Sequence, residues 1–401
     1  MAIQDTPVVK YPSQAPPKSD GKNPHVMIAG AGLGGLLLAI LLDKAGIPYQ
    51  LYERAKEVKP FGAIMSLNAG ILPTLEQLEL FEDLQKLSLP ATGKFNIYKS
   101  DLTTITTLSA SPTEFIGYDH IVFARPDFYD LLLSKIPAEN IHFNKKVVSL
   151  EQNKEGVMIR CTDGTTYHGD ILVGADGAYS GVRQALYMDL EKSGQLPLSD
   201  AIELNKGFIC MAGTTTSLDP AKYPGVDDKA AQCNQIIGKN NYTWSVFSVP
   251  GNRICWNVVL KLSTIKESAE HKCKNSEWDQ ETSVPTNKDV RDFLIPFNGT
   301  LEDLIDATPR DNISRVFLED KLFDTWHHGR TVLIGDALQD AVVLANCLYG
   351  MKGLTPDNIN EALGTFRQER FGRVKSQYKS SRTSAQLLYG QVLRLCSAWK
   401  P

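Results

Sequence analysis

The sequence predicts an α/β fold: a Rossmann-like dinucleotide-binding domain with an inserted antiparallel β-sheet domain and C-terminal helices. Two observations carry this prediction. A strand, a glycine-rich turn, a helix and a second strand follow one another from His25 to Arg54, which is the order found in the first half of a dinucleotide-binding fold. Residues 207–262 are rich in β-branched and aromatic side chains and are interrupted by turns, a pattern typical of antiparallel strands.

The glycine-rich turn contains a Gly-x-Gly-x-x-Gly motif formed by Gly30, Gly32 and Gly35. The first glycine permits a tight turn, the second lets backbone amides approach a pyrophosphate, and the third lets the helix pack closely on the strand. The second strand ends at Glu53, whose carboxylate can accept hydrogen bonds from ribose hydroxyls. A membrane span or a signal peptide would also explain the apolar run here, but its glycines and Glu53 favour a nucleotide site.

Length and composition exclude several classes of protein. The 401 residues are enough for two domains, and 42% hydrophobic with 22% charged residues is ordinary for a globular protein. A net charge of −4 without a basic block argues against a nucleic-acid partner. Seven cysteines without a Cys-x-x-Cys pair indicate reduced thiols in a cytoplasmic protein rather than disulfides or a zinc site. No other run reaches spanning length, so stable membrane insertion is not expected.

The two ends of the chain differ from its middle. Residues 1–23 contain four prolines and few apolar side chains, which predicts a disordered tail. Residues 386–399 are weakly amphipathic. We expect them to pack on the main body, and peripheral contact with a membrane is the alternative.

A second strand-to-turn segment covers residues 170–183. A buried strand of Ile, Leu and Val is followed there by Asp176 and Gly177, and then by a predicted helix that contains Arg183. In open α/β sheets, ligand contacts lie at the carboxyl ends of strands. This segment is therefore a candidate ligand site.

Two arginines are open to more than one interpretation. Arg54 is suited equally to pairing with a phosphate and to a surface salt bridge. Arg125 directly precedes Pro126, which can occupy the first turn of a helix. A structural salt bridge is the alternative role for Arg125.

Aromatic and histidine side chains offer further candidates. Trp244, Phe247 and Trp256 lie in the β-rich region and either line a pocket or, as is more common, form core. The pair His327–His328 suggests a metal, but no third ligand has suitable spacing. We therefore expect surface histidines and no metal.

The remaining pattern predicts further elements. Helices are expected at residues 69–87 with an interruption near Pro73, at 289–305 with a break at Pro296, at 339–348 and at 355–375, and residues 267–287 are expected to form a loop.

Three motifs in order resemble those of FAD-dependent monooxygenases of the p-hydroxybenzoate-hydroxylase-like class. They are the glycine motif with Glu53, the Gly174-Ala-Asp-Gly-Ala178 segment with Ser180 and Arg183, and Gly335-Asp336-Ala337. Within the class, the chain is similar to the fungal branch that oxidises aromatic and isoprenoid compounds. The resemblance covers residues 24–382.

The resemblance implies FAD, with NAD(P)H as a transient reductant. It implies that Glu53 holds the adenosine ribose, that Arg125 lies near the pyrophosphate and ribityl chain, and that Asp336 holds the same region. Asp176 and Gly177 are implied to serve both the flavin and NAD(P)H. The full set of cofactor-binding candidates is Gly30, Gly32, Gly35, Glu53, Arg54, Gly62, Arg125, Asp176, Gly177, Gly335, Asp336 and Ala337.

The implied reaction is hydroxylation or epoxidation of an apolar aromatic or isoprenoid small molecule with O₂ and NAD(P)H. The flavin supplies the difficult chemistry while the protein orients it and excludes water. The class implies no protein nucleophile and no general catalytic acid or base, so no catalytic residue is assigned.

One segment departs from the family pattern. In the family, Gly-Asp-Ala is followed by a loop and a Gly-Gln-Gly turn that opens a helix, whereas this chain continues from Ala337 directly to Leu338-Gln-Asp-Ala-Val342. The absent loop would supply backbone amides and a positive helix end beside the flavin ring. Two alternatives follow: a non-catalytic or impaired relative, and an uncoupled flavin NAD(P)H oxidase or reductase.

The predicted domain organisation is discontinuous. The tail is residues 1–23, the FAD-binding domain is 24–93, 120–190 and 316–365, the substrate domain is 94–119 and 191–315, and the C-terminal helices are 366–401. The oligomeric state is not predicted.

Overall fold

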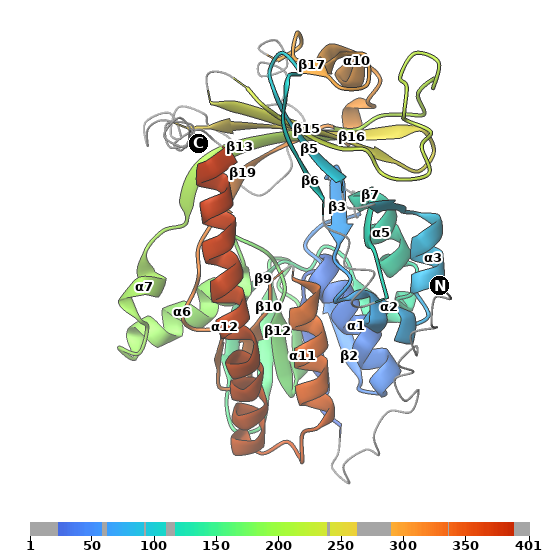
Figure 1. Cartoon of the computed structure of the whole chain (residues 1–401). Helices are drawn as coiled ribbons and strands as arrows, with labels where there is room; N and C mark the ends of the chain where they lie inside the picture. Colours follow the sequence, from blue (N-terminus) through green and yellow to red (C-terminus); the bar gives the residue numbers. More distant parts are fainter. Residues whose placement is uncertain are drawn as a thin grey trace, which may run out of the picture.

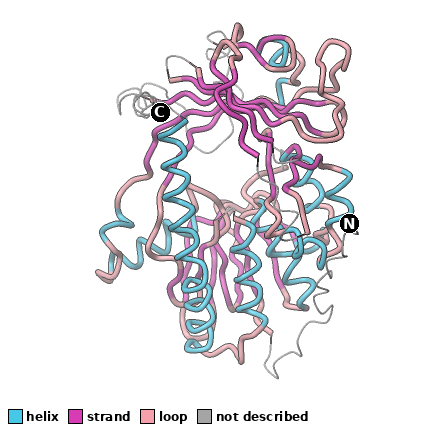
Figure 2. The backbone as a smooth tube through the Cα atoms, in the orientation of Figure 1, coloured by secondary structure: helices cyan, strands magenta, loops and turns pink. Residues whose placement is uncertain are grey.

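The computed structural model describes residues 23–57, 62–91, 94–109, 117–238, 241–262, 290–335 and 337–388. Its strands gather in two main blocks, a six-stranded sheet and a seven-stranded sheet, at opposite ends of the molecule (Figure 2). Helices pack against the six-stranded sheet, and the long α12 (Pro356–Leu388) runs from it toward the seven-stranded sheet (Figure 1). The expected α/β fold with an added, mainly antiparallel sheet is confirmed.

The six-stranded sheet has its central strand at the start of the described chain. Its order is β20 (His327–His328), β21 (Thr331–Leu333), β12 (Ile171–Gly174), β1 (Val26–Ala29), β2 (Tyr49–Tyr52) and β8 (Ile141–His142). All neighbours are parallel except β20 and β21. The chain adds β2 on one side of β1 and the much later β12 on the other side, so the strand order reverses at β1. Open α/β sheets bind ligands at such a point.

Alternation along β1 explains the two layers that cover this sheet. Val26 and Ile28 face a core shared with helices, whereas Met27 and Ala29 face a second, smaller core. The helical layer contains α1 (Leu33–Ala45), α5 (Arg125–Leu133), α11 (Leu338–Tyr349) and α12. The opposite layer contains α6 (Gly181–Lys192) and a three-stranded sheet of β9 (Val147–Gln152), β10 (Val157–Cys161) and β11 (Thr166–Gly169).

The seven-stranded sheet is built from distant parts of the chain. Its order is β19 (Ser314–Asp320), β13 (Asn205–Thr214), β16 (Arg253–Lys261), β15 (Tyr242–Val249), β14 (Cys233–Ile237), β5 (Lys94–Lys99) and β6 (Thr104–Ser109). Only β14 and β5 pair in parallel. On one face it packs with α10 (Leu301–Asp306) and with residues 290–297, and on the other it meets β3 (Ile64–Leu67), β7 (His120–Ala124) and β4 (Leu89–Ala91).

The two faces of this sheet separate its aromatic side chains. Trp244 and Trp256 are buried on the face that packs with α10, where their ring N–H groups donate to Leu294 O and Thr308 Oγ1. Phe247 packs on the opposite face. The two tryptophans are therefore core residues, which was the commoner of the two roles expected.

Several expected elements differ in the structure. The helical stretch after residue 69 forms two helices, α2 (Leu72–Gln77) and α3 (Phe81–Lys86). The break between them lies at Glu79, which has a positive φ of 59°. The expected interruption near Pro73 is wrong, because Pro73 occupies the first turn of α2. Within residues 290–300, the expected helix is wrong: β17 (Leu294–Ile295) and β18 (Gly299–Thr300) form a hairpin around Asn298, and only α10 follows.

Two expected domain boundaries fall inside continuous elements. β19 carries the seven-stranded sheet to Asp320, past the expected limit at residue 315, because it pairs along β13. α12 runs without interruption across residues 365 and 366. The expected tail and the loop at 267–287 lie outside the described residues, apart from Asn23.

Two ion pairs tie the two ends of the molecule together. Arg253 of β16 makes a two-pronged ion pair with Asp127 of α5, at 2.6 and 3.4 Å. Arg382 Nε of α12 lies 3.6 Å from Asp320 Oδ2 of β19.

No helix of the described segments is long and apolar enough to cross a membrane.

Candidate functional site

A pocket of about 700 Å³ lies where β1, β2 and β12 reach their carboxyl ends. It brings together seven of the twelve residues predicted from the sequence. These are Gly30, Gly32, Glu53, Arg54, Arg125, Asp176 and Gly177. Segments that are far apart in the chain therefore share one pocket at the point where strand order reverses.

The glycine motif forms the floor of this pocket, and each glycine is constrained differently. Gly30 has a φ of 104°, and a Cβ there would come within 2.4 Å of Ala175 O. A Cβ at Gly35 would lie 2.1 Å from Gly30 O. At Gly32, by contrast, the nearest atom to an added Cβ is 4.0 Å away. Gly30 and Gly35 are therefore required for packing, while Gly32 keeps open the space above the turn.

α1 starts directly after Gly32 and presents its N-terminus to the pocket. No side chain caps this end, and its first turn carries no acidic residue. The backbone amides and the helix dipole at this end favour an anion. A helix end of this kind, above a glycine that leaves space, suits a pyrophosphate.

Glu53 holds the shape of the turn as well as lining the pocket. One carboxylate oxygen accepts from Ala31 N at 2.8 Å, and the other accepts from Ala55 N at 2.8 Å. Each oxygen has a second lone pair. The carboxylate can therefore fix two loops and still accept hydrogen bonds from a ligand.

Gly62 packs against Arg125, which lies on another wall of the pocket. Arg125 N donates to Ala63 O at 2.9 Å, and a Cβ at Gly62 would lie 2.8 Å from Arg125 Cδ. Gly62 has a φ of 108°, which is unfavourable for other residues. The glycine therefore makes room for the arginine side chain.

Asp176 couples the second motif to the start of α6. Its Oδ2 accepts from Gly181 N at 2.7 Å and Val182 N at 3.3 Å. Its Oδ1 is buried and has no hydrogen-bond partner among the described residues. Burial raises the pKa of Asp176, and the hydrogen bonds from α6 oppose that rise. The carboxylate has one oxygen committed to the helix and one that lacks a partner beside the pocket.

The third motif lies next to α1 but is not on the pocket wall. Gly335 O would be 2.6 Å from a Cβ at Gly34, so the end of β21 packs tightly on the start of α1. Ala337 precedes α11, which begins at Leu338. Asp336 lies outside the described residues, and neither Gly335 nor Ala337 lines the pocket in the described part of the chain.

The pocket wall also contains polar side chains that the sequence analysis missed. They are Tyr52, Lys56, Tyr129, Lys145, Lys146 and Tyr179. Tyr129 follows Arg125 by one turn of α5, so helical spacing would have pointed to it. Its hydroxyl is buried without a partner among the described residues, and burial raises its pKa. Tyr179 donates to Glu319 of β19, a long-range contact without a local signal.

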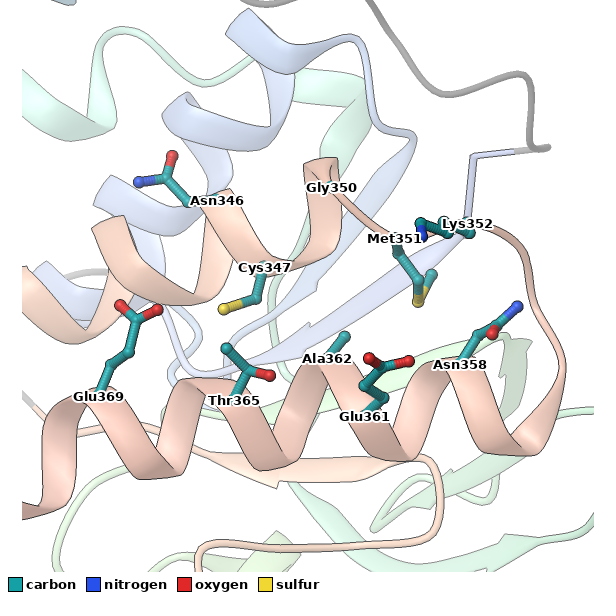
Figure 3. Close-up of a pocket in the computed structure, with 10 residues that line it drawn as sticks. All are labelled: Asn346, Cys347, Gly350, Met351, Lys352, Asn358, Glu361, Ala362, Thr365 and Glu369. Atoms are coloured by element: carbon teal, nitrogen blue, oxygen red, sulfur yellow. The ribbon is translucent and has the colours of Figure 1, made fainter.

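A second hollow of about 320 Å³ lies between α11 and α12, and Figure 3 shows its lining. Cys347 of α11 and Thr365 of α12 face each other there. Burial raises the pKa of Cys347 to about 11. None of the motif residues reaches this hollow, so the pocket at the strand ends is the candidate site.

Comparison with known proteins agrees with this site. Residues 23–206 match the family model described as an FAD binding domain. The chain is 29% identical over 394 residues to the FAD-dependent monooxygenase paxM of Penicillium paxilli, covering 89% of this chain and 77% of the relative. It is 28% identical over 386 residues to the FAD-dependent monooxygenase ptmM of Penicillium ochrochloron, covering 89% and 87%.

Solved structures show the same fold at lower identity. HpxO of Klebsiella pneumoniae, complexed with FAD and uric acid, gives a TM-score of 0.71 at 21% identity, covering 94% of this chain and 91% of the other. The 2,6-dihydroxypyridine-3-hydroxylase of Arthrobacter nicotinovorans gives 0.72 at 18% identity, covering 92% and 94%.

The comparisons support an FAD-dependent monooxygenase of the p-hydroxybenzoate-hydroxylase-like class, with an FAD binding domain over residues 23–206. Its cofactor is FAD. The pocket fits that cofactor in three respects: the space above Gly32, the uncapped start of α1, and the buried Asp176 Oδ1 without a partner among the described residues. The fungal monooxygenases paxM and ptmM are what this chain is similar to in sequence.

Proposed function

We propose that the protein is an NAD(P)H-dependent monooxygenase that inserts one oxygen atom into an apolar aromatic or isoprenoid small molecule. The observation that carries the proposal is the meeting of the glycine motif, Glu53, Arg125 and Asp176 around one pocket. The chemistry supplied by FAD in such a protein is the two-electron use of NAD(P)H to activate O₂, so that one oxygen atom enters the substrate and the other leaves as water.

In this proposal each wall of the pocket has its own task. The start of α1 and Gly32 receive the pyrophosphate, and Glu53 accepts from the adenosine ribose. Arg125 serves the pyrophosphate and ribityl region, as the resemblance implies, and Arg54 and Gly62 are further cofactor-binding candidates. Asp176 and Gly177 lie at the opposite wall and serve both the flavin and NAD(P)H. As the resemblance implies, Asp336 serves the ribityl and pyrophosphate region, and Gly335 and Ala337 flank it in the sequence.

The preference for an apolar substrate is supported by the seven-stranded sheet. The ring centroids of Phe95 and Phe247 lie 6.3 Å apart, on the face of the sheet that meets β3 and β7. Cys233 and Cys255 are buried on the same face. Apolar walls with a few polar groups are typical of small-molecule sites. We propose a cytoplasmic location because the cysteine usage fits a reducing compartment.

A second candidate is a relative with impaired or lost oxygenation, and one observation favours it. α11 begins at Leu338, so only residues 334–337 separate it from the end of β21 at Leu333. In addition, Gly335 N donates to the carboxylate of Asp340 at 3.2 Å and is therefore already used within the protein. A shortened wall beside the flavin ring would let the reduced cofactor release peroxide instead of oxygenating a substrate.

Flavin retention and coupling distinguish these candidates. The purified protein is saturated with FAD and desalted, and its visible absorbance is recorded. NAD(P)H consumption, hydrogen peroxide and ¹⁸O incorporation from ¹⁸O₂ are then measured with candidate substrates. Retained flavin with label in the product supports the monooxygenase. Retained flavin with stoichiometric peroxide indicates the uncoupled oxidase, and loss of flavin indicates the non-catalytic relative. If a family-type loop inserted after Ala337 raises neither flavin retention nor coupling, the shortened wall is not the cause.

A further inference from the structure

Three neutral polar side chains form a row across the seven-stranded sheet. Gln235 of β14 pairs with Ser245 of β15, and Ser245 pairs with Asn257 of β16. Paired residues on adjacent strands point to the same face of a sheet. We call these three residues the polar row.

The polar row lies on the face that is turned toward the FAD pocket. The neighbouring row on the same face contains Cys233, Phe247 and Cys255. Cys255 Sγ lies 3.4 Å from Ala63 O, which also accepts from the backbone N–H of Arg125 on the pocket wall. Asn257 follows Cys255 by two residues on β16, and two residues along a strand span about 7 Å. The polar row therefore lies about 7 Å along the sheet from this contact.

Burial and hydrogen bonding separate these side chains from ordinary core. Gln235 and Ser245 are only 7% and 6% exposed. Nevertheless, the described part of the chain offers no hydrogen-bond partner to the side chain of any of the three. The fully enclosed polar atoms that lack a partner in this structure belong to other residues. The polar atoms of the row are therefore in contact with solvent, although the Gln235 and Ser245 side chains are largely buried.

Most of the side chains around the row are apolar. Ile97 and Ala212 flank it in the same register. The next row outward contains Ile237, Thr243 and Val259. In these rows the described sheet carries one charged side chain, Lys99, which lies on the exposed outer part of β5. A carboxylate bound at the row would lose hydration, and none of the row's own side chains is cationic.

We propose that Gln235, Ser245 and Asn257 select a neutral, mostly apolar substrate that carries a carbonyl or hydroxyl group. This inference rests on the proposed monooxygenase function and specifies its substrate class. A carbonyl or hydroxyl group satisfies the buried amides and the hydroxyl of the row. A plain hydrocarbon leaves them unpaired when it displaces water, which is unfavourable.

Binding of three matched probes to the FAD-saturated protein tests this assignment. Geraniol, 2,6-dimethyl-2,6-octadiene and geranate share one isoprenoid skeleton and carry a hydroxyl, no polar group and a carboxylate. Isothermal titration calorimetry gives their dissociation constants without requiring turnover. The variants are Gln235→Leu, Ser245→Ala and Asn257→Leu. Thr107→Val, on the exposed edge strand β6 of the same sheet, is the matched control.

We expect geraniol to bind at least about ten-fold more tightly than the other two probes. Each variant should reduce that preference about three-fold to ten-fold without changing thermal unfolding, and Thr107→Val should leave the preference unchanged. Equal affinity for the three probes, no binding of geraniol, or an undiminished preference in all three variants overturns the assignment. Flavin retention and ¹⁸O incorporation are measured separately, so failure of the polar row is distinguishable from failure of the proposed function.

Discussion

Arg370 Nε lies 2.7 Å from Asp340 Oδ1, and both side chains are almost completely buried, with exposed fractions of 8% and 5%. The second oxygen of Asp340 accepts from Gly335 N. One carboxylate therefore joins α12 to α11 and to the end of β21, in the segment where the family loop is absent. The pair supports the short connection between β21 and α11, because Asp340 gives the backbone amide of Gly335 an acceptor.

Removing the arginine should destabilise the protein strongly. Arg370→Met leaves a buried carboxylate without a cation, which typically costs about 3–5 kcal/mol of the free energy of unfolding. The double variant Asp340→Asn with Arg370→Met keeps an amide oxygen for Gly335 and removes the unpaired charge, so it should recover at least half of that loss. Urea unfolding of the three proteins measures this. A loss below about 1 kcal/mol in Arg370→Met would contradict the role of the pair.

Two glycines of the same motif should respond differently to alanine. Gly35→Ala places a Cβ 2.1 Å from Gly30 O and should lower the free energy of unfolding of the FAD-free protein by about 1–3 kcal/mol or more. Gly32→Ala meets no atom closer than 4.0 Å and should leave that free energy nearly unchanged.

For Gly32→Ala the expected effect is on the cofactor. The methyl group enters the space that we assign to the pyrophosphate, so FAD affinity should fall at least about ten-fold. Flavin fluorescence titration gives the affinity, and thermal unfolding without FAD is the control. If Gly32→Ala binds FAD like the unmodified protein, the pyrophosphate does not lie on this turn.

The nucleotide half of the site was predictable because its signals are local. Gly30, Gly32 and Gly35 stand where the backbone of one turn requires glycine, and Glu53 directly follows the strand β2 that comes after α1. The break at Glu79 was not predictable, because a glutamate with a positive φ carries no such signal. The polar row and the Tyr179–Glu319 contact depend on strand register between distant segments, which short-range patterns do not encode.

Acidification should reveal the buried Asp176. Because burial raises the pKa of Asp176 in the folded state, the folded protein binds a proton more readily than the unfolded chain between the usual pKa of about 3.9 and the raised value. The contribution of this group to stability should therefore increase as pH falls through that window. The Asp176→Asn variant lacks this contribution.

The relevant quantity is the difference in free energy of unfolding between the unmodified protein and Asp176→Asn. Urea unfolding without FAD at a series of pH values from pH 7 down to about pH 4 gives this difference. We expect it to shift in favour of the unmodified protein as the pH falls. Parallel pH dependences, or a shift in the opposite direction, would show that Asp176 is not a desolvated carboxylate.

Four cysteines should resist alkylation in the folded protein. Burial raises the pKa of Cys233 and Cys347 to about 11 and that of Cys210 and Cys255 to about 12. At pH 8 at most about one molecule in a thousand then carries the reactive thiolate. Peptide mapping after a short iodoacetamide pulse should show little modification at these sites and full modification in urea. Rapid labelling of Cys210 or Cys347, which are only partly buried, would contradict the raised pKa values.

The order of strands in the six-stranded sheet has a consequence for biosynthesis. β1 leaves the ribosome first, but it pairs with β12 through Val26 and Ile171, and β12 pairs in turn with β21 through Leu172 and Thr331. β5 likewise waits for β14. Apolar strand edges thus stay uncovered until most of the chain has been made, which slows folding and favours aggregation. Neither sheet can be completed from one half of the gene, and the nascent protein is expected to depend on chaperones that hold its early strands apart.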